Sequence, residues 1–377
     1  MSDPFPREVF VIGAGMTSFG RHEGKTIQDL GPEAVRAALA DAGLGYEAIE
    51  TAYCGHVLQG STAGQRVLYP IGMSGIPIFN IENACASGTS ALRAAAQAVG
   101  HGIADIALAC GFEVMSRGAI PTGGDARLER GQPKGVAPLP ALFSAVYLAH
   151  AERYGTTLEQ LAAVTVKNRA YGAKNPRAQF HDSVTLEEVM ASREVAPPLR
   201  LLMCCPTTSG AAAVIVASAD VARQTRKPIR IVASVLRSDP RIDLRDPLSG
   251  ITEINTAAMR TAFEQAGVRP DQLDTAEVHD CFSIAEIIHY ENLGLCERGE
   301  GGRFAEQGLK DARVKVSTSG GLLAKGHPLG ATGVAQAVEA VEQLRGESGE
   351  RQVEGAKLSL THCQGFGGAA GVHIFAK

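Results

Sequence analysis

The chain alternates between short apolar runs of strand length and longer stretches whose apolar residues recur at helical spacing. Helical patterns are predicted at residues 26–42, 90–99 and 334–344. Strands are predicted at residues 9–12, 48–54, 76–81, 103–110, 211–217, 229–236 and 356–360. Regular alternation of the two element types predicts an α/β fold in which predominantly parallel sheets are covered by helices.

One unit of this pattern occurs twice in the chain, at a constant offset and without a gap. The identical pairs are Ala34/Ala258, Arg36/Arg260, Ala38/Ala262, Ala42/Ala266, Gly43/Gly267, Thr51/Thr275 and Ala52/Ala276. A second match pairs Gly88-Thr89-Ser90 with Ala331-Thr332-Gly333, each before an alanine-rich helix and a strand. Two copies of one βαβ-rich half, related by duplication, are the simplest explanation.

Residues 116–205 fit neither half. They begin with a stretch rich in Gly, Pro and charge (121–140) and continue with helical patterns at 158–170 and 185–191. A long insertion in a compact fold is typical of a lid or binding loop. We therefore predict an N-terminal half from residues 1–115 and 206–225, an inserted loop domain at 116–205, and a C-terminal half at 226–377.

Composition excludes several classes of protein. The 377 residues carry a net charge of −4, without the basic excess that nucleic-acid binding requires. No apolar run approaches the ~20 residues of a membrane span, and no signal peptide is visible. Eight cysteines without any C-x-x-C pair favour reduced thiols over disulfides or a zinc knuckle, so we expect a cytoplasmic protein without metal or membrane insertion.

A glycine-rich stretch after the first predicted strand resembles the start of a dinucleotide-binding fingerprint. It runs Gly13-Ala14-Gly15-Met16-Thr17-Ser18, with Ser18 where the third glycine belongs. The following segment is helical rather than a strand ending in an acidic residue. A tight turn after a core strand is therefore the interpretation, and a dehydrogenase is disfavoured.

Cys85 is the first candidate for chemistry. It lies between an apolar run and an alanine-rich helix, so its sulfur is predicted near a helix N-terminus, where the dipole favours thiolate. The small residues around it would let a substrate carbonyl approach closely. A buried structural cysteine is the alternative interpretation.

Three further segments contain residue types suited to catalysis, and each follows a predicted strand of the duplicated unit. They contain His327 in a Gly/Pro turn, His279 in His-Asp-Cys-Phe, and Cys363 in a glycine-rich stretch. A histidine near a cysteine can take the thiol proton, and glycines let backbone N–H groups point at an oxyanion. Parallel sheets gather such groups at the carboxyl ends of their strands.

These motifs resemble the signature segments of the thiolase superfamily over nearly the whole chain. The segments are Asn-Ala-Cys-Ala-Ser-Gly at 83–88, Gly-His-Pro-Leu-Gly-Ala-Thr-Gly at 326–333 and Cys-Gln-Gly-Phe-Gly at 363–367. His-Asp-Cys-Phe at 279–282 looks like the sterol-carrier-protein or lipid-transfer type, and so does the stretch at 206–213, apart from Ser209 where an aspartate is common. The resemblance implies a thiolase fold with two βαβαβαββ halves in five α-β-α-β-α layers.

The resemblance also implies roles for the candidates. Cys85 would be the nucleophile that carries the acyl group, and His327 would activate it. His279 and His327 would line a first oxyanion hole, and the N–H groups of Cys85 and Gly365 a second. Cys363 would be the acid/base; Cys281 is the alternative, because lipid-transfer-type members often use the cysteine of His-Asp-Cys-Phe.

Other candidates are weaker. Ser319 and Gly320 are expected near coenzyme A or the substrate, and His56 follows a strand and can reach the cleft. His22, His101, His150 and His289 are interpreted as surface or helix-cap residues. Basic residues of the insertion (Arg127, Arg130, Lys134, Lys167 and Arg169) are interpreted as solvated rather than as phosphate ligands.

The predicted activity is cleavage of a 3-oxoacyl-CoA by coenzyme A, or the reverse Claisen condensation, through an acyl-Cys85 intermediate. A bulky steroid side-chain, aromatic or fatty acyl group is expected, with coenzyme A as co-substrate and no permanently bound cofactor. A related condensing enzyme or acyltransferase, a retro-aldol enzyme and a non-catalytic acyl-CoA- or lipid-binding subunit remain alternatives. The resemblance implies a homodimer or dimer of dimers, and a separate OB-fold, zinc-ribbon partner is possible.

Overall fold

The computed structural model describes residues 4–116, 138–240, 243, 245–307 and 312–377. Its main feature is a mixed sheet in the order β10-β9-β11-β12-β8-β1-β7-β4-β2-β3. The strands of this sheet are β1 (Val9–Met16), β2 (Thr51–Gly55), β3 (Ile78–Ile81), β4 (Ile106–Glu113), β7 (Gly210–Ser218), β8 (Ile229–Ser238), β9 (Thr275–Glu277), β10 (Lys315–Val316), β11 (Leu358–Gly365) and β12 (Ala369–Ala376). A separate pair, β5 (Glu194–Ala196) and β6 (Leu199–Arg200), lies in the insertion.

The large sheet consists of two halves with the same strand order. The N-terminal half runs β3-β2-β4-β7-β1, and the C-terminal half runs β10-β9-β11-β12-β8. The halves join edge to edge where β1 pairs with β8 in antiparallel direction, with Phe10 opposite Arg230 and Val11 opposite Ile229. The sheet order therefore repeats the duplication seen in the sequence.

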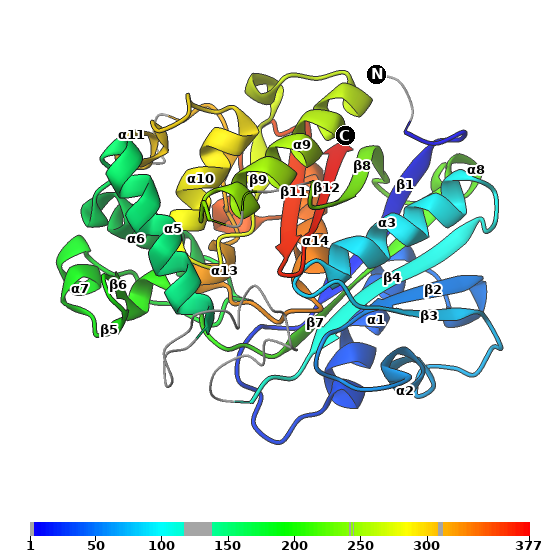
Figure 1. The fold of residues 1–377 in the computed structure, drawn as a ribbon. Coiled ribbons are helices and arrows are strands. Elements are labelled where there is room, and N and C mark those ends of the chain that lie inside the picture. Colours follow the sequence, from blue (N-terminus) through cyan, green and yellow to red (C-terminus); the bar gives the residue numbers. More distant parts are fainter. Residues whose placement is uncertain (1–3, 117–137, 241–242, 244, 308–311) are drawn as a thin grey trace.

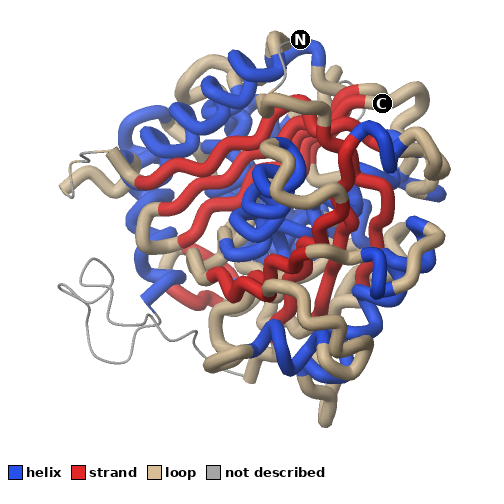
Figure 2. The backbone as a smooth tube through the Cα atoms, turned by 90° about the vertical axis from the view of Figure 1, so that its right-hand side faces the viewer, coloured by secondary structure: helices blue, strands red, loops and turns tan. Residues whose placement is uncertain are grey.

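Helices form three layers around the two halves (Figures 1 and 2). Helix α1 (Ile27–Ala42) covers the N-terminal sheet, and α9 (Ser249–Ala266) covers the C-terminal sheet. Helices α3 (Ser87–Gly100) and α14 (Thr332–Arg345) pack against each other and contact strands of both halves. The α-β-α-β-α layering predicted above is confirmed.

The remaining helices are short or belong to the insertion. They are α2 (Ala63–Leu68), α5 (Pro138–Tyr154), α6 (Leu158–Gly172), α7 (Leu186–Ala191), α8 (Ala219–Ala222), α10 (Ser283–Leu293), α11 (Gly301–Glu306) and α13 (Gly321–Ala324), with 3-10 turns η1 (Tyr46–Ala48), η2 (Leu201–Met203), η3 (Pro270–Gln272) and η4 (Gly349–Arg351). No helix in the described part of the chain has the length and apolar character to cross a bilayer.

The two copies of the repeated unit have the same local structure. Helix α1 ends at Gly43 with φ 69°, and α9 ends at Gly267 with φ 64°. Both glycines adopt the left-handed conformation that ends a helix without the steric penalty of a side chain. A 3-10 turn and then a strand follow each glycine, so the sequence repeat predicted this local structure correctly.

Two predictions about the strands were wrong. Within the described residues, the parallel pairs of the large sheet are β2–β3, β2–β4, β9–β10 and β9–β11, and its other five pairs are antiparallel. The glycines at 13 and 15 do not form a turn, because β1 extends through them to Met16. A Cβ on Gly15 would lie 2.5 Å from the backbone nitrogen of Ala38, so these glycines allow α1 to pack closely on the strand.

Glycine also allows the first turns of the two central helices to touch. A Cβ on Gly88 of α3 would lie 2.6 Å from the carbonyl oxygen of Gly330 and 3.1 Å from the nitrogen of Val334 in α14. A Cβ on Gly333 would lie 2.3 Å from the nitrogen of Thr89. The two halves therefore meet backbone to backbone at this point.

Replacing Gly88 by alanine is expected to lower the free energy of unfolding by about 1–3 kcal/mol, because backbone atoms must move to admit the methyl group. Chemical denaturation measures the change. The matched control is Gly20→Ala, since a Cβ there meets nothing within 4 Å. Equal stability of the two variants would contradict close contact between the central helices.

Candidate active site

Four predicted residues come from connections or strands of both halves. Cys85 lies between β3 and α3, and His327 lies between α13 and α14. His279 follows β9, and Cys363 lies within β11. The duplication thus brings the corresponding connections of both halves to one place.

A tight turn presents Cys85. Ala84 adopts a left-handed φ of 48°, the N–H of Ala86 donates to Asn83 O at 3.0 Å, and the N–H of Ser87 donates to Ala84 O at 3.0 Å. The N–H of Asn83 in turn donates to the Ser87 hydroxyl at 2.9 Å. These bonds hold the sulfur at the N-terminus of α3, as predicted.

The structure brings three of the predicted side chains together. Cys85 Sγ and one ring nitrogen each of His279 and His327 all lie within 4.8 Å of one another. His279 Nε2 and His327 Nε2 are 3.4 Å apart. The fourth residue, Cys363, is adjacent, because its thiol donates to the carbonyl oxygen of Cys85 at 2.9 Å.

A hydroxyl group selects the tautomer of His327. Thr332 Oγ1 donates its one hydrogen to Pro328 O at 2.9 Å, so it accepts from His327 Nδ1 at 2.7 Å. The Nε2 atom of His327 is then unprotonated and faces both His279 and Cys85. His327 is therefore prepared to accept the thiol proton.

Burial keeps the resting groups neutral. It raises the pKa of Cys85 to about 12, with a smaller contribution from the charge of Glu113, although the N–H groups of Cys85 and Phe366 act in the opposite direction. Burial also lowers the pKa of His279 to about 3 and lowers that of His327 well below its ordinary value. The expectation that the helix N-terminus would favour the thiolate was wrong for the resting protein, because the effect of burial on the pKa of Cys85 is the larger one.

Glu113, at the end of β4, is a site residue that sequence reasoning missed. Its Oε2 accepts from Gly330 N at 2.9 Å and from Val57 N at 3.0 Å, and its Oε1 accepts from Leu58 N at 2.9 Å. The side-chain amide of Gln59 donates to the same Oε1 at 2.5 Å. This fully buried carboxylate therefore joins the β2–α2 connection to the loop that carries His327.

Replacing Glu113 by glutamine is expected to lower kcat roughly 10- to 100-fold with little change in KM, because displacement of a catalytic group by about 1 Å has such effects. All four hydrogen-bond partners of the Glu113 carboxylate donate N–H groups. The NH2 group of a glutamine at this position would therefore face two of these donors. Removing the negative charge should also lower the pKa of Cys85, making its alkylation by iodoacetamide faster at a given pH.

The pH profile of alkylation separates positioning from a general loss of stability. Glu350→Gln, at an exposed position, is the control and should match the wild type in every measurement. An unchanged kcat and an unchanged alkylation profile in Glu113→Gln would show that the carboxylate serves the fold alone.

A cavity of about 1130 Å³ opens beside these groups. Cys85, Cys281 and His327 line it, and its wall includes Phe282, Phe366, Leu139, Leu201 and Leu202. Four basic side chains also line it: Arg21, Lys25, Arg169 and Arg193. The cavity thus combines an apolar wall with cationic groups and also contains Cys85 in its lining.

The insertion supports the apolar wall. The ring of Phe143 in α5 stacks on Phe282 with centroids 4.3 Å apart, and meets Phe366 edge-on at 5.6 Å. Phe366 follows Gly365, whose α-carbon lies so close to Asn83 that a Cβ would come within 2.0 Å of its carbonyl oxygen. Gly365 is therefore next to the turn of Cys85.

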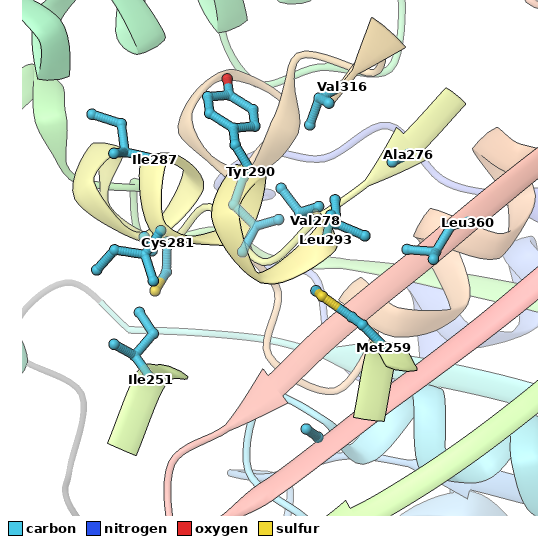
Figure 3. Packing of buried hydrophobic residues seen from close by; sticks show 14 of the residues in the cluster. Ile251, Met259, Ala276, Val278, Cys281, Ile287, Tyr290, Leu293, Val316 and Leu360 are labelled. Carbon is cyan, nitrogen blue, oxygen red and sulfur yellow. The ribbon is translucent and has the colours of Figure 1, made fainter. Parts of the chain in front are cut away.

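The two candidate acid/base thiols occupy different surroundings. Cys363 is fully buried and packs with Cys85 and Leu329. Cys281 lies among the apolar side chains of the C-terminal core and also lines the cavity (Figure 3). The N–H of Cys205 donates to Cys281 O at 2.9 Å, which fixes the backbone beside this thiol.

Among the described residues, the weaker candidates Ser319, Gly320 and His56 do not line the cavity. Ser319 Oγ donates to Glu277 at 2.5 Å, and Gly320 has φ 97° at the start of α13. His56 is buried and stacks on Phe112 with centroids 5.8 Å apart. The structure gives Ser319 and His56 contacts in the protein interior.

Several other interpretations need correction. His150 and His289 are buried rather than exposed, and His150 contacts Thr156 at 2.7 Å and Glu291 at 3.2 Å. Lys167 pairs with Glu286, and Arg169 is buried and lines the cavity, so neither is a freely solvated charge. Arg127, Arg130 and Lys134 lie outside the described residues.

Asp280 is a second residue beside the site for which no role was predicted from the sequence. Its carboxylate accepts from Leu322 N at 2.8 Å and from Asn168 at 2.7 Å, fixing α13 against the segment that carries His279. Burial, followed by the charge of Glu286, raises the pKa of Asp280 to about 8. Its position between His279 and Cys281 in the sequence was the signal that could have identified it as a site residue.

A buried cysteine lies beside a neutral histidine at the junction of two duplicated α/β halves, an arrangement typical of enzymes that use a cysteine nucleophile. The chain belongs to the thiolase family. The model of the thiolase N-terminal domain matches residues 9–220, and the thiolase C-terminal domain-like model matches residues 241–377. The protein is therefore an acyltransferase of the thiolase type.

Curated relatives agree over almost the full chain. An acetyl-CoA acetyltransferase of Methanothermobacter thermautotrophicus is 45% identical over 387 residues, covering 98% of this chain and 100% of the relative. Sterol carrier protein 2 of Bos taurus is 42% identical over 396 residues, covering 99% of this chain and 73% of the relative. The benzoylsuccinyl-CoA thiolase subunit BbsB of Thauera aromatica is 36% identical, covering 96% and 95%.

Solved structures show the same fold. The Ltp2-ChsH2(DUF35) aldolase superposes with a TM-score of 0.86 at 26% identity, covering 99% of each chain. Human mitochondrial 3-ketoacyl-CoA thiolase in complex with CoA superposes with a TM-score of 0.76 at 22% identity, covering 100% of each chain. The thiolase fold predicted from the motifs is thus confirmed.

Proposed function

We propose that this protein cleaves a 3-oxoacyl-CoA with coenzyme A, or runs the reverse Claisen condensation, through an acyl-Cys85 intermediate. The observation that carries the proposal is the cluster of Cys85 Sγ and the ring nitrogens of His279 and His327 within 4.8 Å. A cysteine suits the reaction because its acyl adduct is a thioester, matched in energy to the CoA thioesters on both sides.

The geometry supports a specific first step. His327 Nε2 removes the proton of Cys85, and the sulfur attacks the 3-oxo carbon of the substrate. Nε2–H groups of His279 and of the protonated His327, 3.4 Å apart, then converge on the developing oxyanion. Both imidazoles are buried, so these hydrogen bonds act in a site of low dielectric.

The second step breaks the bond between C2 and C3. The electron pair passes to the acetyl-CoA enolate, which Cys363 protonates, and the acyl group remains on Cys85. The thiol of coenzyme A then attacks this thioester and restores the free cysteine. The N–H groups of Cys85 and Gly365 are proposed to hold the thioester oxygen during this transfer.

The cavity favours an acyl group larger than acetyl. Its volume of about 1130 Å³ and its Phe282–Phe366 wall suit a bulky, aromatic or fatty acyl chain. The name of the BbsB relative refers to an aromatic acyl-CoA. A retro-aldol cleavage is the second candidate, because the Ltp2 neighbour is an aldolase; the Cys85 nucleophile favours thiolysis.

A homodimer is proposed from the exposed end of the sheet. Among the described residues, β3 pairs with β2 alone, and nearby side chains of Phe79 (49% exposed), Tyr69 (50%) and Met73 (78%) face solvent. A second copy would cover this edge. A separate DUF35-type partner is also proposed, following the name of the Ltp2-ChsH2 neighbour.

The test is intact mass spectrometry after brief incubation with acetyl-CoA, acetoacetyl-CoA and bulky acyl-CoAs. The wild type should gain one acyl group, and Cys85→Ala should gain none. Incubation with coenzyme A should then remove the adduct. Absence of any adduct across the panel, with a DUF35-type partner present, would leave a non-catalytic acyl-CoA-binding subunit as the function.

A further inference from the structure

The geometry points to a zinc-binding site formed by Cys85, His279 and His327, at which a bound ion would block the nucleophile. Thiolate sulfur and imidazole nitrogen are the ligands that Zn²⁺ prefers in proteins. This inference goes beyond the proposed function and does not depend on turnover, because binding of the ion can be followed directly.

The first argument is the spacing of the donor atoms. Two imidazole nitrogens about 2.0–2.1 Å from a tetrahedral zinc ion lie about 3.3–3.4 Å apart. His279 Nε2 and His327 Nε2 are separated by 3.4 Å. The two histidines are therefore already at the separation that the ion requires.

The thiol needs only a small adjustment. In a tetrahedral site, sulfur and nitrogen ligands lie about 3.6 Å apart. Cys85 Sγ is no more than 4.8 Å from either ring nitrogen. A movement of about 1 Å, within reach of a side-chain rotation, completes a three-ligand set.

The surroundings of His327 are those of a metal ligand. Its Nδ1–H donates to Thr332 Oγ1 at 2.7 Å, which fixes the ring and directs Nε2 toward the cluster. Metal-binding histidines usually have such an outer hydrogen bond. Cys85 and His327 also line the cavity, so a fourth coordination position is open to water or to a ligand carboxylate.

The exchange of protons is balanced. The ion replaces the hydrogen of the Cys85 thiol, which leaves to solvent. His279 moves its ring hydrogen from Nε2 to Nδ1 and then presents a lone pair. The ion would occupy the Cys85 sulfur and the Nε2 lone pairs of both histidines, where the proposed base and oxyanion contacts lie, so occupancy of the site and acylation of Cys85 exclude each other.

The experiment is a titration of the full-length, chelator-treated protein with Zn²⁺ in competition with a chromophoric chelator. We expect one equivalent to bind with a dissociation constant of about 1 µM or tighter. Cys85→Ala and His279→Asn should each weaken binding by roughly 100-fold or more, because even the loss of an outer partner weakens metal sites 10- to 100-fold. Melting curves of both variants test that they are folded.

Matched controls separate this site from other thiols. Cys204→Ser, which lines the same cavity, and Cys296→Ser, which is partly exposed, should bind Zn²⁺ as the wild type does. Co²⁺ provides a second readout, because charge-transfer absorption of a cobalt–thiolate bond should appear in the wild type and be absent from Cys85→Ala.

Two results would overturn the inference. One is stoichiometric zinc binding that persists in Cys85→Ala, which would place the ion at other thiols or at surface histidines. The other is no binding up to about 100 µM Zn²⁺, far above the affinity expected of a three-ligand site. Either result would leave the proposed acyl transfer untouched.

Discussion

Replacing Cys363 by alanine is expected to lower the rate of thiolysis by about 10³-fold, while acylation of Cys85 by acetyl-CoA continues. Proton transfer by a positioned side chain contributes about 10²- to 10⁴-fold to such reactions. Formation of an acyl adduct from acetyl-CoA needs only the nucleophile and its base. The Cys363 thiol lies against Cys85, donating to its carbonyl oxygen at 2.9 Å, so it can reach a substrate carbon bound at that residue.

Cys281→Ala is the matched variant for this prediction. Cys281 lines the cavity, whereas Cys363 packs behind Cys85. If Cys363 is the acid/base, loss of Cys281 should change the rate less than tenfold. Steady-state thiolysis and the mass of the acyl adduct, measured on both variants, decide the assignment; the opposite order of rates would transfer the role to Cys281.

Acid is expected to destabilise the protein strongly between pH 6.5 and pH 5. Burial lowers the pKa of His279, His289 and His373 to about 3, and lowers those of His327 and His362 well below the ordinary value. The unfolded chain binds a proton at each of these residues below about pH 6.5, while the folded protein does not. The stability that neutral histidines contribute is therefore present above pH 6.5 and is lost as the pH falls below it.

The expected loss is large. His279, His289 and His373 each contribute about 2 kcal/mol between pH 6.5 and pH 5, since one pH unit corresponds to about 1.4 kcal/mol per proton, and His327 and His362 act in the same direction. Asp280 acts in the opposite direction, because its raised pKa of about 8 lets the folded protein bind a proton first. The net decrease in the free energy of unfolding is on the order of 5 kcal/mol or more.

Urea denaturation at the two pH values, followed by far-ultraviolet circular dichroism, measures this loss. His373→Gln keeps a donor for the carbonyl oxygen of Thr89, which the ring contacts at 3.1 Å. This variant should take up about one proton fewer on unfolding, so its free energy of unfolding should depend less on pH. His101→Gln, at an exposed position, should leave it unchanged. Equal stability at both pH values would mean that these rings are protonated in the folded protein.

Much of the fold could be predicted because the duplication is visible in local sequence. The helices that end at Gly43 and Gly267 needed only periodicity and a C-terminal glycine. Strand direction was not predicted, because apolar runs look alike in either direction. One signal was available for β12: the turn at residues 365–368 is rich in glycine and joins β11 to β12 as a hairpin.

The site was predicted in part for a similar reason. Cys85, His279 and His327 stand in short motifs, and the sheet brings them together. Glu113 was not predicted, because its role depends on Gly330, 217 residues away. Histidines such as His289 were placed on the surface because a polar residue in a helix is usually exposed, and its burial arises from packing that local sequence does not encode.

The meeting of α3 and α14 has a consequence for the origin of this chemistry. Cys85 and His327 stand before equivalent helices of the two halves. In a dimer of identical halves, the segments before these two helices would have the same sequence. In one chain the two segments can differ, so that one carries the proposed nucleophile and the other the proposed base. A duplication within one chain thus permits the asymmetry that the proposed acyl transfer requires.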